Sequence, residues 1–558
     1  DLADISLIFD MGGQTRKVAI EVVSIKSYTL RVKLKNNAEI DGIDLNLVKE
    51  ARIDVKDPAF LLEELRKQFN SLDFEDTFNL QQNLPQNIEF VFGPPGTGKT
   101  THLARNVLIP FMQKTETLKI LVLTPTNKAA DVLVSRIMEI MGGDKSYEKW
   151  LVRFGATNDE SIEQSPVFRD KTFDIRKLPR NVTVTTIARF PYDYFIPDSS
   201  TRLHLAALQW DYIVIDEASM VPVANIIFPI YKKTPEKFII AGDPFQIEPI
   251  TTVENWQDEN IYSMVKLNQP RSFTSPATTP HAFEITRLTT QYRSIPVIGE
   301  MFSRFTYGGI LQHHRQPVSQ RTLQIDHFDL RPLNIIKFPV SKYESIYRAK
   351  RLQGKTPYHI YSALFTFEFT KHIASQIQKN QSDDKTFKIG IIAPYRAQAN
   401  LIDKLIASWR QVPSNASLQT GTIHGFQGDE CDIIITVFNP PPGISSSPKM
   451  FLNKQNILNV SISRARDYLF ILMPDDQTEN ISQLQKVKEI ETLAKASKEY
   501  SETHANLIED LIFGQSNYLE ENAFSTSHQI VNVYSKPEKR YEVRSEDVAI
   551  DVQIHDNL

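Results

Sequence analysis

A short stretch in the N-terminal part of the chain has the composition of a phosphate-binding loop. It reads Gly-Pro-Pro-Gly-Thr-Gly-Lys-Thr over residues 93–100 and matches the pattern G-x-x-x-x-G-K-[ST]. Its glycines let backbone N–H groups turn toward an anion. Lys99 would reach the β- and γ-phosphates of a nucleotide, and the Thr100 hydroxyl would hold Mg²⁺. The expected nucleotide contacts are Gly93, Pro94, Pro95, Gly96, Thr97, Gly98, Lys99, Thr100 and Thr101.

The surroundings of this loop support the same interpretation. The apolar run 90–92 precedes it and a helical pattern over 101–107 follows, which is the strand–loop–helix order that such a loop requires. The alternative is a Gly/Pro-rich turn that matches by chance, and the correct placement of strand and helix argues against it. The sequence therefore predicts binding of a nucleoside triphosphate.

A second stretch, residues 212–219, is an apolar strand pattern that ends in two adjacent carboxylates. An Asp at the end of such a strand, here Asp216, can hold the Mg²⁺ that Thr100 also holds. Glu217 is placed to orient or deprotonate the attacking water. The pair could instead cap a helix, but the phosphate-binding loop favours the catalytic interpretation.

Three further side chains could act on the γ-phosphate. Gln246 follows the strand pattern 238–241, although the intervening Gly-Asp-Pro is also a common turn. Arg293 and Arg464 lie later in the chain, and an arginine that crosses a domain cleft can stabilise transition-state charge and tie hydrolysis to closure. Taken singly, an arginine in such a position is more often a surface or ion-pair residue.

The elements that would position these side chains are those of α/β domains. From residue 90 onward, short continuous apolar runs alternate with helical patterns, as in parallel sheets covered on both faces. The runs form two series, which implies two such domains in tandem. They are 120–123, 212–215 and 238–241 in the first, and 389–393, 433–437 and 469–472 in the second.

The domain organisation follows from these series and from the segments around them. We predict a small β module over 1–56, a helical connector over 57–87 with a helix at 59–69, a first α/β domain over 88–285 with an insertion at about 140–181, a second α/β domain over 286–474, and a C-terminal helical and β extension over 475–558.

Composition narrows the class of protein. Of the 558 residues, 41% are hydrophobic and 23% charged, as in ordinary globular proteins. The single cysteine, Cys431, excludes a disulfide framework or a cysteine-ligated metal centre built by this chain alone. No apolar run approaches a membrane span and no signal peptide is visible, so we expect a soluble cytoplasmic protein without a membrane partner. With a net charge of −4, any nucleic-acid contact would need a local groove.

A series of motifs between residues 88 and 474 resembles the superfamily 1 helicases. The resemblance is closest to the branch of the nonsense-mediated-decay RNA helicase and its DNA-acting relatives. In order, the motifs are Gly-Pro-Pro-Gly-Thr-Gly-Lys-Thr, Leu-Thr-Pro-Thr-Asn-Lys-Ala-Ala, Asp-Glu-Ala-Ser, Gly-Asp-Pro-Phe-Gln, Gln-Tyr-Arg-Ser, His-Gly-Phe-Gln-Gly-Asp-Glu and Ser-Ile-Ser-Arg-Ala-Arg.

The resemblance implies a fold and a set of residue roles. The two domains would be RecA-like, and the β module would be a small barrel on a helical stalk. Gln246 would couple the γ-phosphate to the strand, and Arg293 and Arg464 would be arginine fingers. Further contacts would be Gly428 beside the phosphates, Glu430 to the ribose and Tyr292 on the base. A nucleic-acid groove would be lined by Thr124, Pro125, Thr126, Asn127 and Thr422.

The activity implied is ATP-dependent movement, 5′ to 3′, on single-stranded nucleic acid, with DNA somewhat favoured over RNA. The adenine-reading Gln of the family has no clear counterpart among Gln81, Gln82 and Gln86, which leaves strict ATP selectivity open. The β module and the C-terminal extension are the expected places for a protein partner. Two other functions stay open: a P-loop ATPase that remodels proteins without a strand to move along, and a non-catalytic scaffold.

Overall fold

The computed structural model covers the 558-residue chain. The residues it describes are 5–11, 15–26, 29–34, 48, 50–55, 59–72, 87–157, 159–197, 201–249, 256, 259–269, 283–352, 356–380, 386–409, 411–423, 425–426, 430–525, 531–536 and 539–543.

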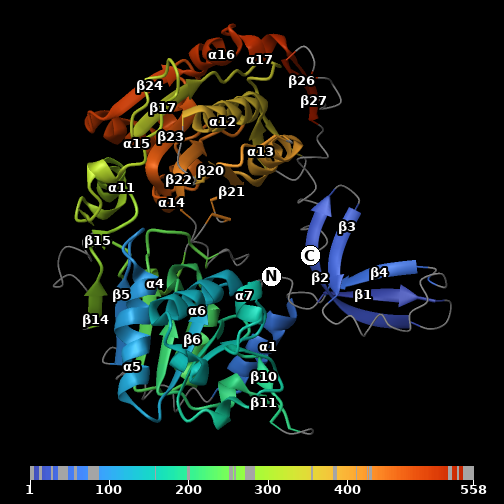
Figure 1. The fold of residues 1–558 in the computed structure, drawn as a ribbon, viewed down its shortest axis with the longest axis vertical. Helices are drawn as coiled ribbons and strands as arrows, with labels where there is room; N and C mark the ends of the chain where they lie inside the picture. Colours follow the sequence, from blue (N-terminus) through green and yellow to red (C-terminus); the bar gives the residue numbers. More distant parts are fainter. Residues whose placement is uncertain are drawn as a thin grey trace.

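An eight-stranded parallel sheet forms the centre of the first α/β domain (Figure 1). The strand order is β14-β5-β13-β12-β6-β9-β7-β8. The inner strands are buried almost throughout, which explains their continuous apolar sequences. The strands are β5 (Ile88–Phe92), β6 (Lys119–Thr124), β7 (Leu151–Phe154), β8 (Phe168–Arg169), β9 (Asn181–Thr186), β12 (Tyr212–Ile215), β13 (Lys237–Gly242) and β14 (Glu284–Arg287).

Helices cover both faces of this sheet. Helix α4 (Lys99–His102) continues through a π-helical turn, η3 (Leu103–Leu108), into α5 (Ile109–Lys114), and α6 (Asn127–Met141) packs beside it. Helix α8 (Val223–Lys232) belongs to the hydrophobic cluster on the other face. The parallel, doubly covered sheet predicted from the apolar runs is confirmed.

A six-stranded parallel sheet, in the order β21-β20-β22-β23-β17-β24, forms the second domain. Its strands are β17 (Leu333–Phe338), β20 (Phe387–Ala393), β21 (Ala416–Thr422), β22 (Cys431–Val437), β23 (Ala465–Pro474) and β24 (Tyr500–His504). Its main helices are α11 (Pro296–Tyr307), α12 (Ile360–Asn380), α13 (Arg396–Ser408), α14 (Gln455–Ile462), α15 (Gln485–Ala496) and α16 (Ala505–Phe513).

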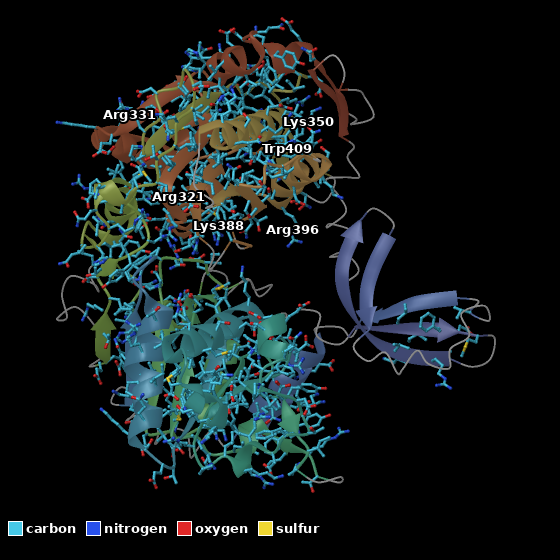
Figure 2. All side chains as sticks on the ribbon, in the orientation of Figure 1. Arg321, Arg331, Lys350, Lys388, Arg396 and Trp409 are labelled. Atoms are coloured by element: carbon cyan, nitrogen blue, oxygen red, sulfur yellow. The ribbon has the colours of Figure 1, made fainter. Side chains whose placement is uncertain are left out.

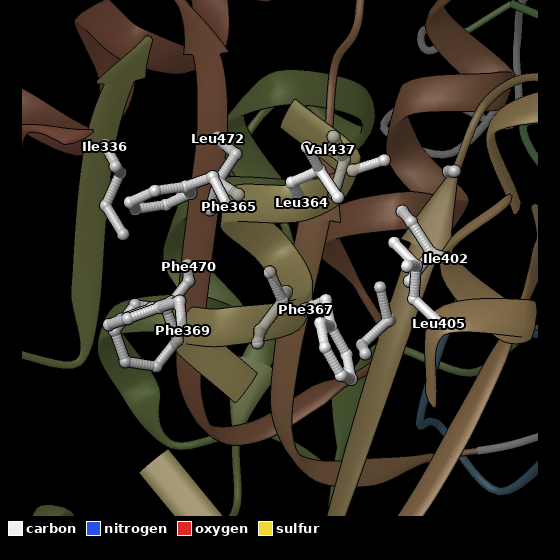
Figure 3. Packing of buried hydrophobic residues seen from close by; sticks show 14 of the residues in the cluster. Ile336, Leu364, Phe365, Phe367, Phe369, Ile402, Leu405, Val437, Phe470 and Leu472 are labelled. Atoms are coloured by element: carbon white, nitrogen blue, oxygen red, sulfur yellow. The ribbon is translucent and has the colours of Figure 1, made fainter. Parts of the chain in front are cut away.

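Aromatic side chains of α12 fill the core of this second domain (Figure 3). Phe365, Phe367 and Phe369 are all buried, and Phe369 meets Phe470 of β23 edge-on with 5.2 Å between ring centres. Such fully buried aromatic rings contribute a large share of the burial that stabilises a domain. This core therefore fixes the second sheet, and several predicted site residues of this domain lie at the ends of its strands.

The segments predicted as an insertion and as a C-terminal extension contribute strands to the two sheets. The stretch at about 140–181 supplies β7 and β8 to one edge of the first sheet, where Leu151–Phe154 is buried. The segment after residue 475 supplies β24 to the edge of the second sheet, together with α15 and α16. All three strands are short and have charged neighbours in the sequence, so none produces the long apolar run by which the other strands were recognised.

The N-terminal module is a four-stranded antiparallel sheet in the order β3-β2-β1-β4, followed by α1 (Ala59–Asn70), which agrees with the helix predicted at 59–69. The strands are β1 (Ile5–Asp10), β2 (Thr15–Lys26), β3 (Thr29–Leu34) and β4 (Glu50–Val55). Figure 1 places this sheet beside the two domains. No pairing joins β3 to β4 among the described residues, and closure into a barrel stays a prediction.

The described C-terminal strands form a separate three-stranded antiparallel sheet of β25 (Ala523–Ser525), β26 (Val531–Lys536) and β27 (Lys539–Val543). Within the described part of the chain, no helix is long and apolar enough to cross a membrane.

Candidate nucleotide site

The phosphate-binding loop lies between the end of β5 and the start of α4. Gly96 and Gly98 have φ angles of 73° and 75°, a left-handed conformation that glycine adopts without strain. A Cβ atom at Gly93 would lie 2.6 Å from the Cβ of Lys99, so the loop closes tightly around the stem of that lysine. The sequence thus places its glycines where the backbone turns and where the Lys99 stem passes.

Lys99 forms the electrostatic centre of the site. Its Nζ atom lies 2.9 Å from Asp216 Oδ1 and 2.6 Å from Glu217 Oε1, and its side chain is 6% exposed. Burial lowers the pKa of Lys99, but the two carboxylates outweigh it and raise the pKa above its ordinary value. The ammonium group is therefore charged, and it neutralises the carboxylates on which the predicted chemistry depends.

The two carboxylates follow β12 on a constrained backbone. Glu217 has a φ angle of 51°, which is uncommon for a residue with a side chain, and its N–H donates to Asp216 Oδ1 at 2.8 Å. Burial raises the pKa of Asp216, and Lys99 opposes that shift. Left-handed residues of this kind occur preferentially at functional sites, where the strain fixes a side chain in its working direction.

The side chains present fit a magnesium–nucleotide complex. Asp216 is a buried carboxylate, Thr100 supplies a half-buried hydroxyl one residue after Lys99, and oxygen ligands of this type are those that Mg²⁺ prefers. Lys99 and the backbone N–H groups at the start of α4 offer positive charge to phosphate oxygens. These residues would hold the metal and the triphosphate, as the sequence predicts.

The second domain reaches directly to the phosphate-binding loop. The Tyr292 N–H donates to Gly96 O at 2.8 Å, and a Cβ atom at Gly96 would lie 2.7 Å from Arg293 Cβ. Arg293 donates through Nε to Glu430 at 2.9 Å and through NH1 to Ser463 O at 2.9 Å. Arg293 thus lies beside the loop, and its role as an arginine finger stays a prediction.

Glu430 bridges two arginines. It accepts from Arg293 at 2.9 Å and from Arg466 NH1 at 2.9 Å. Burial raises the pKa of Glu430, but the two guanidinium groups outweigh burial and the net shift is downward. A ribose contact, which the resemblance implies for Glu430, stays a prediction, since here its oxygens accept from arginines.

Gln246 and Arg464 also meet across the domain boundary, with Arg464 NH2 3.3 Å from Gln246 Oε1. Tyr292 is 52% exposed, and its ring centre lies 4.7 Å from that of His314. An exposed ring beside the phosphate-binding loop can pack against a base, as predicted for Tyr292. Gly428, predicted to lie beside the phosphates, is outside the described residues.

The residues predicted to line a nucleic-acid groove lie at the carboxyl ends of two strands. Thr124 ends β6, and its hydroxyl donates to Thr126 O at 2.9 Å, while the Thr126 hydroxyl caps α6 by accepting from Ala129 N. Asn127 is mostly buried and accepts from Arg153 NH2 at 3.1 Å. In this stretch Thr126 and Asn127 order the start of α6, and the half-buried Pro125 lies between Thr124 and Thr126.

Thr422 ends β21 in the second domain and lines a cavity of about 480 Å³. The other residues of this cavity combine positive charge with aromatic and apolar surface; they are Arg351, Thr356, Pro357, Pro394, Tyr395, Arg396, Pro441, Met450 and Phe451. Basic and aromatic side chains together are typical of surfaces that hold single-stranded nucleic acid. Of the predicted groove residues, Thr422 is the one that lines this cavity.

Sequence reasoning missed several residues around the site. Asp243 lies inside a recognised motif and Asn459 two residues before one. Neither was given a role, and both are fully buried at the domain boundary. Tyr307 ends α11 and carries no motif signal. Arg153, wholly buried under α6, lies in the stretch predicted as an insertion. Only for Asp243 and Asn459 did the sequence hold a usable signal, because Asp243 lies three residues before Gln246 and Asn459 five residues before Arg464.

Together, the phosphate-binding loop, the paired carboxylates and the arginines from a second parallel-sheet domain define a P-loop nucleotide-binding protein of two tandem α/β domains. Two family models, each described as an AAA domain, match residues 79–252 and 272–475. The chain belongs to the superfamily 1 helicases, in the branch of the nonsense-mediated-decay RNA helicase and its DNA-acting relatives.

The chain is similar to helicases with DNA-related and RNA-related names. The chain is 23% identical over 405 residues to the DNA replication ATP-dependent helicase/nuclease dna2 of Schizosaccharomyces pombe, covering 68% of this chain and 26% of the relative. It is 23% identical over 457 residues to the probable RNA helicase armi of Drosophila melanogaster, covering 74% and 37%. The chain therefore spans well under half the length of these relatives.

Among solved structures, the chain is similar to a complex of Arterivirus nonstructural protein 10 (helicase) with DNA. The identity is 13% and the TM-score 0.35, with 71% of this chain and 63% of that chain covered.

Proposed function

We propose that the chain is an ATP-dependent helicase or translocase that moves 5′ to 3′ on single-stranded nucleic acid, with DNA favoured over RNA as its track. One observation carries the proposal: Arg293 lies against the phosphate-binding loop of the other domain, with a Cβ at Gly96 only 2.7 Å from Arg293 Cβ. A site completed by two domains makes turnover depend on how those domains are arranged.

The residues of this chain would act in a definite order. A triphosphate draws the Lys99 ammonium toward its oxygens and away from the carboxylates, which lie 2.9 and 2.6 Å from it. Asp216 and Thr100 would hold Mg²⁺, which would supply charge neutralisation at the phosphates. Glu217 is then available to orient and deprotonate the attacking water. Arg293 and Arg464 would stabilise the charge that develops on the γ-phosphate.

Strand movement would follow from repeated opening and closing of the two domains. Thr124, Pro125, Thr126, Asn127 and Thr422 would contact the strand at the ends of β6 and β21. The basic and aromatic cavity beside Thr422 supports this proposal, because phosphate contacts and base stacking hold a single strand without reading its sequence. The N-terminal sheet and the C-terminal extension would serve for contact with a protein partner.

The test is steady-state ATP hydrolysis with no polymer, with single-stranded DNA and with single-stranded RNA of the same sequence. We expect stimulation by at least one polymer, and stronger stimulation by DNA. Lys99→Ala and Glu217→Gln should abolish turnover, because each removes a group at the reacting phosphate, while strand binding persists. Polymer-stimulated hydrolysis retained in either variant would refute the site assignment.

Direction is measured separately, on partial duplexes with a 5′ or a 3′ single-stranded tail. We expect unwinding of the 5′-tailed duplex, because the proposed movement is 5′ to 3′. Basal hydrolysis with no polymer stimulation and no salt-dependent binding of an oligonucleotide would instead support a protein-remodelling ATPase. Nucleotide binding without turnover in the wild-type chain would support a scaffold.

A further inference from the structure

The loop that carries Gln246 follows β13 of the first domain but is embedded in the second. Ile247, the next residue, is fully buried in a hydrophobic cluster made mainly of second-domain side chains. The Phe245 ring meets the Tyr307 ring edge-on, with 5.8 Å between ring centres. A displacement of the second domain would therefore be transmitted to this loop.

The Tyr307 hydroxyl lies at the centre of a buried network. It donates to Asp243 Oδ2 at 2.6 Å and accepts from Asn459 Nδ2 at 2.8 Å. These roles are fixed, because an amide nitrogen only donates and an ionised carboxylate only accepts. Asn459 Nδ2 also donates to Phe245 O at 2.9 Å, so both second-domain residues hold the first-domain loop.

The network ends at the two residues that would act on the γ-phosphate. Asp243 Oδ2 also accepts from Gln246 Nε2 at 2.9 Å. This contact turns Gln246 Oε1 toward Arg464, whose NH2 lies 3.3 Å away. All five side chains are at most 6% exposed. Hydrogen bonds in such a water-excluded place are strong and directional.

We propose that Tyr307 and Asn459 are positioning residues for hydrolysis. By holding Asp243 and Phe245, they fix the amide of Gln246 relative to Arg464 and make the Gln246 loop follow the second domain. The inference rests on the proposed function, in which Gln246 and Arg464 act on the γ-phosphate, and it adds two residues that touch neither nucleotide nor strand.

The experiment compares Tyr307→Phe, Asn459→Leu and the double variant in polymer-stimulated ATP hydrolysis. Tyr307→Phe removes the hydrogen bond to the Asp243 carboxylate, and Asn459→Leu removes the bonds to the Tyr307 hydroxyl and Phe245 O. Each loss should lower kcat about tenfold or more. The KM for nucleotide and the Kd for the strand should change less than about threefold, because neither residue contacts a ligand. The double variant should lose no more than the more damaging single variant, since residues acting as one unit are not additive.

Tyr361→Phe is the matched control. Its hydroxyl is equally buried and donates to a carboxylate, Glu509 Oε1, at 2.5 Å, but both residues lie within the second domain. Both Tyr→Phe variants should lower the melting temperature, whereas only Tyr307→Phe should lower kcat.

An equal kcat for Tyr307→Phe and Tyr361→Phe would overturn the inference, and so would effects of Tyr307→Phe and Asn459→Leu that multiply in the double variant. If Tyr307→Phe does not fold, Asn459→Leu against Tyr361→Phe decides the same question. Absence of polymer stimulation in the wild-type chain contradicts the proposed function instead. The positioning role is then judged by the same comparison of unstimulated kcat.

Discussion

Side chains of opposite charge and of two domains meet within hydrogen-bond distance around the phosphate-binding loop. Lys99 neutralises Asp216 and Glu217, while Arg293 is held by Glu430. At this scale each functional group already has a protein partner, which a bound nucleotide would have to replace. Changes at single residues should therefore act mainly on turnover, because they alter which partner each group takes.

Gly96→Ala should disconnect the second domain from the loop. The new Cβ would lie 2.7 Å from Arg293 Cβ at a residue whose φ angle is 73°. A displacement of about 1 Å in a reacting group can cost about 100-fold in rate, so we expect kcat to fall by about that factor. The measurement is steady-state ATP hydrolysis together with thermal unfolding.

Gly443→Ala is the control for backbone strain alone. Gly443 has a φ angle of 81° and no heavy atom within 4 Å of an added Cβ. It should lose about 1 kcal/mol of stability from the left-handed conformation and keep its kcat. Equal losses of kcat in both variants would show that the contact with Arg293 is irrelevant.

The pH dependence of hydrolysis should report on Asp243. Burial raises its pKa to about 6, although hydrogen bonds from Tyr307, Gln246 and the Phe245 N–H oppose the shift. Protonation would remove the ionised acceptor of Tyr307, so kcat should fall below about pH 6. In Tyr307→Phe this acid limb should move to higher pH, and in Asp243→Asn it should be absent.

Stability should change in the opposite direction, which separates this effect from acid unfolding. Because the native pKa of Asp243 is about 6 and its ordinary value 3.8, the unfolded chain ionises first as the pH rises. The contribution of Asp243 to the free energy of unfolding is therefore present at low pH and lost as the pH rises through 6. An acid limb that coincides with loss of folded protein would contradict the assignment.

At the scale of helices and strands, one buried arginine orders the start of α6. Arg153 on β7 donates to Asp131 Oδ1 at 2.7 Å, to Asn127 Oδ1 at 3.1 Å and to Phe154 O at 2.6 Å, and it also donates to Ala156 O. Asn127 and Asp131 both lie on α6. Strand β7, which was not predicted from the sequence, therefore fixes α6, the helix that follows Thr124–Thr126.

Arg153→Met should destabilise the first domain by about 3–5 kcal/mol, because it leaves the Asp131 carboxylate buried without its partner. Adding Asp131→Leu should restore part of that loss, since an apolar pair of similar volume replaces a buried ion pair at little cost. Urea unfolding of Arg153→Met, Asp131→Leu and the double variant measures the coupling. Strictly additive losses would show that the pair does not act together.

The sequence was sufficient where a motif and the strand before it are contiguous. Lys99, Asp216 and Gln246 each follow a buried parallel strand, so their convergence at one sheet edge could be predicted. The sequence was insufficient where two hydrogen-bonded residues lie far apart in the chain and no motif marks them. Tyr307, for example, is 64 residues from its partner Asp243. The short strands β7, β8 and β24 were missed because charged neighbours mask their apolar period.

At the scale of the whole molecule, positive charge is concentrated locally, although the chain has no net positive charge. The net charge is −4, yet Arg351 and Arg396 line the cavity beside Thr422. Figure 2 shows Arg396 on the edge of the second domain that faces the first, and Arg331 on a distant part of the second domain. Binding of a strand should therefore depend on a few local cations.

Arg396→Ala should weaken binding of a single-stranded oligonucleotide and reduce its salt dependence. Loss of one phosphate contact lowers the slope of log K against log salt concentration by about 0.7 for a single strand. Arg331→Ala is the control, because Arg331 pairs with Asp329 at 2.9 Å away from the cavity. Fluorescence anisotropy at several salt concentrations measures both variants, and identical slopes would exclude Arg396 from the binding surface.

The single cysteine of the chain has a practical consequence. Cys431 begins β22 and is 2% exposed, at the end of the sheet next to Glu430. A thiol-reactive dye should therefore not react with the unaltered protein and should label only cysteines introduced on the surface. A fluorescent pair with one dye on each α/β domain would then report, molecule by molecule, how far apart the domains stand at each stage of the nucleotide cycle.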